Sequence, residues 1–88
     1  MIKSLNVDTP LGRVRIQLHE YDLENNLGGN ISAYMDNREL WNVSAVESGN
    51  SFVDFSFRDQ NIEANTWDGF LYVIEPHTGI IKERYFVK

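Results

Sequence analysis

WDGFLYVIEPHTGIIKERYFVK, residues 67–88, predicts a β-hairpin and is the clearest structural signal in the chain. Residues 70–74 are five consecutive apolar β-formers after an Asp-Gly pair, which is typical of a strand buried on both faces. Residues 75–79 supply the turn, because proline presets φ and glycine tolerates a positive φ. In the return strand, residues 80–87, apolar and basic residues alternate. We therefore expect one face of that strand to be buried and the other to be wet.

The rest of the chain alternates short strands with turns. Residues 13–18 alternate strictly between apolar and polar side chains and are expected to form a hairpin with residues 2–7. Asn37 is expected to adopt a left-handed backbone in a turn. Further strands are predicted at residues 31–35, 40–46 and 52–57, and the inner face of the last should consist of Val53, Phe55 and Phe57.

Residues 59–66 (DQNIEANT) are the ambiguous segment. Asp59 could cap one helical turn, but the asparagines and the threonine that follow are poor helix formers. We expect a loop over the end of the sheet. About seven strands joined by short turns predict a single all-β antiparallel domain over residues 1–88, either a small sandwich or a strongly curved sheet. The alternative is an α+β domain with one short helix near residues 59–65.

Size and composition describe a small globular domain. A chain of 88 residues can hold one core but no deep enclosed pocket as well. The 42% of apolar and 24% of charged residues are ordinary for a folded protein. There is no cysteine, which excludes disulfides and thiolate chemistry. No stretch resembles a signal peptide or a membrane span, so we expect a cytoplasmic protein.

The negative charge lies in the middle of the chain. The net charge is −5, yet residues 20–80 contain eleven acidic residues against two arginines, whereas both ends are basic. This distribution argues against nucleic acid or an anionic membrane as a partner, because both require a basic patch. It is compatible with a basic protein partner, and equally with simple solubility.

Motifs for catalysis are few. His19 lies beside Glu20 and Asp22, a set that could be a metal site or a general acid/base group. The same set is also what an ordinary exposed strand contains. No nucleophile elbow and no phosphate-binding loop pattern occurs in the sequence. We therefore predict that the protein is not an enzyme and needs neither a cofactor nor a metal ion.

Two tryptophans stand among acidic residues. Each could pack in the core, or one could anchor an interface, since tryptophan dominates binding hot spots. An aromatic residue surrounded by carboxylates would suit a basic cleft on a partner. If residues 19–24 stay extended, their three carboxylates share one face. The candidate partner-binding residues are Glu20, Asp22, Glu24, Asp36, Glu39, Trp41, Asp59, Glu63, Trp67 and Asp68.

In size, acidity, β-content and lack of cysteine, the chain resembles the immunity proteins of bacterial toxin systems, including contact-dependent inhibition and related polymorphic toxins. The stretches HEYDLE (19–24), DNREL (36–40) and NIEANTWDG (61–69) carry the resemblance. It implies a protein that binds a cognate toxin, often a basic nuclease domain, and blocks its active site or holds it inactive. The families share no common site pattern, so no residue role carries over.

Other functions stay open from the sequence. An acidic mimic of nucleic acid could inhibit a defence enzyme that binds nucleic acid. A pocket between sheets with His19 inside it would instead indicate an enzyme or a small-molecule binder. A structural β-domain is the remaining class, and a homodimer through a sheet edge is an alternative assembly. Lys82 and Arg84 would protect such an edge from unwanted pairing.

Overall fold

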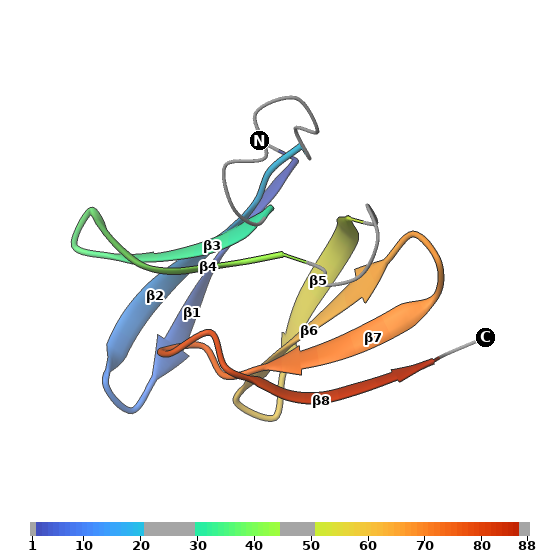
Figure 1. Cartoon of the computed structure of the whole chain (residues 1–88). Helices are drawn as coiled ribbons and strands as arrows, with labels where there is room; N and C mark the ends of the chain where they lie inside the picture. Colours follow the sequence, from blue (N-terminus) through green and yellow to red (C-terminus); the bar gives the residue numbers. More distant parts are fainter. Residues whose placement is uncertain (1, 21–29, 45–50, 87–88) are drawn as a thin grey trace.

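The chain forms two antiparallel four-stranded sheets that pack face to face (Figure 1). The computed structural model describes residues 2–20, 30–44 and 51–86, and these contain eight strands and no helix. The first sheet consists of β1 (Lys3–Thr9), β2 (Gly12–Leu18), β3 (Ile31–Met35) and β4 (Arg38–Val43). The second consists of β5 (Phe52–Arg58), β6 (Asn61–Thr66), β7 (Phe70–Ile74) and β8 (Ile81–Phe86). The all-β prediction is confirmed, in the form of a small sandwich.

Each sheet is a meander, with its strands adjacent in the order of the sequence. The core lies between the sheets and is built from alternating residues of the inner strands. On β2, Val14, Ile16 and Leu18 are fully buried, as their spacing predicts. In the second sheet, Phe52 packs edge-to-face on Tyr72, with ring centroids 5.1 Å apart. Such pairs add to stability beyond the area that they bury.

The expectations of a loop or a short helix over residues 59–66 are both wrong, because this segment contains strand β6. Asp59 and Gln60 have φ angles of 52° and 66°, so a two-residue left-handed turn joins β5 to β6. Hairpins with this turn usually carry Asn-Gly or Asp-Gly, and Asp-Gln lacks the glycine. A similar turn joins β3 to β4, where the predicted left-handed backbone of Asn37 is confirmed at a φ of 65°.

Two predicted inner faces also differ from the structure. The pairing register of β5 shifts between Phe52 and Asp54, so Phe52 points inward and Val53 is 40% exposed. The prediction that Val53 lies on the inner face is therefore wrong, because the register shift breaks the alternation. On β8, only Ile81 packs against the core, and the other residues of the strand are exposed. β8 is an edge strand with β7 as its single neighbour, so its alternation does not produce a buried face.

Asn30 links the two sheets through a buried side chain. Its carboxamide Nδ2 donates to the Phe52 carbonyl at 2.7 Å, and the Phe52 N–H donates back to Oδ1 at 3.2 Å. The same Nδ2 lies 3.2 Å from the carbonyl of His19, which follows β2. With 3% of its surface exposed, Asn30 satisfies the backbone of β5 at its first residue. This contact fixes the start of the second sheet against the first.

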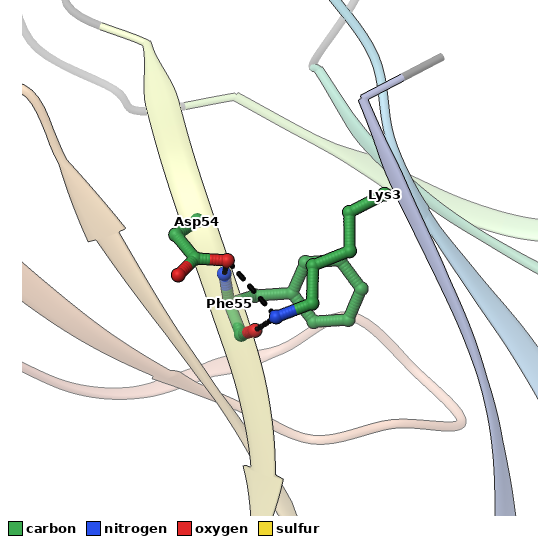
Figure 2. A network of polar contacts seen from close by, with 3 residues as sticks. All are labelled: Lys3, Asp54 and Phe55. Carbon is green, nitrogen blue, oxygen red and sulfur yellow. Dashed lines mark hydrogen bonds and ion pairs between the residues drawn. The ribbon is translucent and has the colours of Figure 1, made fainter.

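Lys3 of β1 makes a second link (Figure 2). Its Nζ donates to Asp54 Oδ1 at 3.0 Å and to the carbonyl of Phe55 at 2.5 Å, and it lies 5.1 Å from the centre of the Phe55 ring. The hydrogen bond from Lys3, together with the backbone N–H of Phe55, lowers the pKa of Asp54 below its ordinary value. An edge strand of each sheet is thereby joined to the other.

The turn between β7 and β8 makes the third link and reaches across to the first sheet (Figure 1). The indole Nε1 of Trp41 donates to the Pro76 carbonyl at 2.8 Å, and His77 hydrogen-bonds the Thr9 hydroxyl. Gly79 has a φ of 74°, and a Cβ added there would lie 2.7 Å from Trp41 Cγ. Only glycine allows the turn to pack this closely on the indole.

Asn30→Ala should destabilise the protein by about 2–3 kcal/mol, because the Phe52 N–H and carbonyl would stay buried without partners. Urea denaturation of the variant measures this loss. Asn6→Ala, at an exposed position on β1, is the control and should change the free energy of unfolding by less than about 0.5 kcal/mol. A loss for Asn30→Ala as small as that of the control would show that the sheets do not depend on this contact.

Glu75 should make the protein less stable in acid. Burial raises the pKa of its carboxyl, but hydrogen bonds from the backbone N–H groups of His77 and Thr78 and from the Thr78 hydroxyl outweigh it, and the pKa lies below its ordinary value of 4.5. The stabilisation is therefore complete above that value and disappears as the pH falls through the folded-state pKa.

In denaturation curves recorded from about pH 6 to about pH 3, the stability difference between the wild type and Glu75→Gln should shrink as the pH falls. Glu83→Gln, which removes the same charge from an exposed residue of β8, serves as the matched control. Parallel profiles for the wild type and Glu75→Gln would contradict the assignment.

Candidate functional site

One end of the second sheet exposes a group of aromatic side chains. Trp67 is 80% exposed, Phe86 55% and Tyr85 44%. Phe70, at the start of β7, is half-buried beside them in the sheet register. We call Trp67, Phe70, Tyr85 and Phe86 the aromatic end. Exposed tryptophan and tyrosine are enriched at protein interfaces, so this end is the leading candidate for a binding site.

A tight turn holds Trp67 at the tip of the hairpin between β6 and β7. Thr66 is buried, its hydroxyl accepts from the Phe70 N–H at 3.1 Å, and the same hydroxyl donates to the Asp68 carboxylate. Gly69 takes the positive φ, 97°, that closes the turn. The backbone N–H of Trp67 donates to the Ser51 carbonyl at 3.3 Å. All these contacts use backbone atoms or other side chains, so the indole plays no part in forming the turn.

Cross-strand pairing organises the other aromatic residues. Phe70 and Phe86 are partners in the register of β7 and β8, and their rings meet edge to face at 5.4 Å. The guanidinium carbon of Arg84 lies 5.3 Å from the centre of the Phe70 ring. Phe86 is the last residue of β8, so it lies at the same end of the sheet as the turn of Trp67.

The acidic residues divide unequally between the sheets. The described residues of the second sheet and its turns, 51–86, carry six acidic and three basic side chains. Those of the first sheet, 2–20 and 30–44, carry four of each. Arg58 and Asp59 of the second sheet form an exposed ion pair, with Arg58 Nε 3.8 Å from Asp59 Oδ2. The negative potential of the described chain is therefore centred on the second sheet, the sheet that carries the aromatic end.

The structure separates several residues that the sequence grouped together. Asp59 and Asp68 lie in turns at opposite ends of β6, with about 20 Å of extended strand between them. Glu63 lies midway along that strand, opposite Val73. Asp36 and Glu39 belong to the first sheet, and Glu20 is exposed after β2. Asp22 and Glu24 lie outside the described residues.

The two tryptophans have opposite environments. Trp41 is 8% exposed, belongs to the core cluster and donates to the Pro76 carbonyl. Its indole is therefore inaccessible as a surface anchor. Trp67, by contrast, is the most exposed of the large apolar side chains in the described chain. Both stand beside acidic residues in the sequence, so neighbouring residues alone did not distinguish them. Tyr85 and Phe86 were not predicted as site residues, because their strand was expected to bury one face.

The two histidines make different contacts within the described chain. The ring of His77 is hydrogen-bonded to Thr9, and the backbone of His19 donates to the Asn30 carbonyl. The described ranges contain no group of three His, Asp or Glu side chains placed to hold a metal ion. None of the residues in these ranges forms a helix of the length and apolarity that crossing a membrane requires.

Comparison of the chain with protein-family models, with curated proteins and with solved structures gives no match. The candidate site therefore rests on the geometry of the chain itself.

Trp67→Phe should leave the free energy of unfolding within about 0.5 kcal/mol of the wild type, because the indole is exposed. The remaining fluorescence, from Trp41, should shift to the blue and resist quenching by acrylamide. Trp41→Phe should do the opposite: the remaining emission is easily quenched, and the protein loses about 1–3 kcal/mol with the hydrogen bond to Pro76. Equal quenching of the two variants would contradict the assignment of one buried and one exposed indole.

Proposed function

We propose that this chain is a protein-binding inhibitor that uses the aromatic end to dock on a basic partner. The observation that carries the proposal is Trp67, 80% exposed in a turn that other groups hold in place. Folding gives no reason for a tryptophan at this position, whereas binding does. The resemblance to immunity proteins supports a cytoplasmic inhibitor of a bacterial toxin as its particular role.

Burial of Trp67 is the main energetic argument. Its exposed surface is on the order of 150–200 Å², which corresponds to about 4–5 kcal/mol if it is fully covered, before the costs of ordering are subtracted. Phe86 and Tyr85 add exposed apolar surface at the same end of the sheet. Exposed tryptophan and tyrosine are the residue types that dominate hot spots, where a few residues supply most of the affinity.

Charge selects the class of partner. Indole rings attract Lys and Arg cations over their faces, and Asp68 places a carboxylate next to Trp67. The acidic excess of the second sheet would accelerate the approach of a basic protein and make the association sensitive to salt. A toxin domain with a basic active-site cleft meets both requirements.

The function is tested by retention of proteins from native host lysate on the immobilised chain. We expect a basic protein that is retained at low salt and lost at high salt, and that Trp67→Ala no longer retains. With the purified partner, Trp67→Ala should weaken binding about 30-fold or more, as expected for a hot spot. Glu83→Lys, which reverses an exposed charge of the second sheet and leaves the turn of Trp67 intact, should mainly slow association.

Leu11→Ala is the matched control for this experiment. Leu11 is 74% exposed in the hairpin of β1 and β2, so its removal takes a similarly exposed apolar side chain from the first sheet. The control should retain the same protein as the wild type. Equal retention by all three chains, or retention that high salt does not reduce, would refute docking of a basic partner at the aromatic end.

A further inference from the structure

The outer face of the first sheet contains a small polar pocket. It has a volume of about 250 Å³ and is lined by Asn6, Arg13, Arg15, Tyr34, Asp36 and Asn37. Every lining residue is polar or charged, and two are arginines in a chain with a net charge of −5. Solubility does not require such a concentration of cationic donors around a hollow.

Strand pairing brings the lining residues together. Asn6, Arg15 and Tyr34 are register partners across β1, β2 and β3, so they form one row on the outer face. Arg13 precedes Arg15 by two residues and therefore shares this face, about 7 Å along the strand. The turn at Asp36 and Asn37 supplies the remaining wall.

The Arg15 guanidinium contacts an aromatic ring, but one of its hydrogen-bond donors has no acceptor among the described residues. Its guanidinium carbon lies 5.1 Å from the centre of the Tyr34 ring, a cation–π contact that helps to hold the group in position. Its Nε is buried and has no hydrogen-bond partner in the described part of the chain. A buried donor without an acceptor costs about 1–3 kcal/mol. The contact with the ring holds the group, but it leaves Nε without an acceptor within the described ranges.

Arg13 adds a second source of donors. Its Nε donates to Asp8 Oδ1 at 2.9 Å, while 69% of the side chain remains exposed. A guanidinium carries five N–H donors, so this single bond leaves others available. Two arginines at this spacing on a flat face can both donate to the oxygens of one ligand.

We propose that this pocket binds a small oxyanion, the carboxylate or phosphate group of a small molecule. Planar guanidinium groups match the oxygens of both groups. The volume lies below the range of about 300–1,000 Å³ that is typical of pockets for drug-sized ligands, so the ligand, or the part of it that enters, is small. The carboxylate of Asp36 opposes an anion, which keeps the affinity modest. The pocket lies on the first sheet, so its test is independent of docking at the aromatic end.

The test is a ¹⁵N NMR titration of the whole protein with inorganic phosphate and, separately, with acetate, at an ionic strength held constant with sodium chloride. We expect shifts confined to the lining residues and a dissociation constant on the order of millimolar. Tighter binding of phosphate would assign a phosphate ester, and tighter binding of acetate a carboxylate. Shifts spread over the surface, or none beyond those caused by chloride, would overturn the proposal.

Three variants complete the test. Arg15→Gln should weaken binding about tenfold, and Asp36→Asn should strengthen it several-fold by removing the opposing charge. Arg38→Gln is the control, since it removes the same charge from an exposed position outside the lining and should change the affinity less than about twofold. Equal effects of Arg15→Gln and Arg38→Gln, or no gain in Asp36→Asn, would show that the protein attracts anions only through its general charge.

Discussion

The hydrogen bonds between Asn30 and the backbone of Phe52 are the contact on which the arrangement of the sheets depends. Each sheet is a meander of consecutive strands, so the described strands share no ladder between the sheets. Apolar packing favours contact between two such sheets but is not directional. The buried carboxamide supplies direction, because its donor and acceptor must both meet the same residue of β5. Lys3 and the turn that carries Pro76 reinforce this orientation elsewhere along the interface.

That interface also explains why the two tryptophans differ. Trp41 is enclosed because the turn between β7 and β8 folds over it, which requires Gly79 to approach the ring without a Cβ. Trp67 lies in a turn that is complete without its side chain. One indole therefore stabilises the contact between the sheets, and the other is available for binding. In the proposed inhibitor, the free energy lost by leaving the Trp67 indole in water is recovered when a partner covers it.

Much of the fold follows from local sequence. Strict alternation on β2 and the apolar run of β7 specify strands, because side-chain direction repeats every second residue. The sequence did not predict β6 for two reasons. Its turn uses Asp59 and Gln60 in left-handed conformations, without the glycine that usually marks such a turn. Its outward residues are asparagine and glutamate, which are not typical of strands. The inner face of β5 was predicted incorrectly because a register shift breaks the alternation of inward and outward side chains. The candidate site was predicted in part: Trp67 and Asp68 were named, but Trp41 could not be excluded without the distant Pro76 and Gly79.

Charge along the sequence becomes charge across the molecule because the topology is so simple. Consecutive strands stay in one sheet, so the acidic excess of residues 51–86 collects on the second sheet, while the described part of the first is balanced. This balance lets Arg13 and Arg15 remain a local cationic feature, since the distant acidic residues are largely screened at physiological salt. The acidic surface proposed to attract a basic protein and the pocket proposed to hold a small anion therefore belong to different sheets. The two proposed sites share no residue.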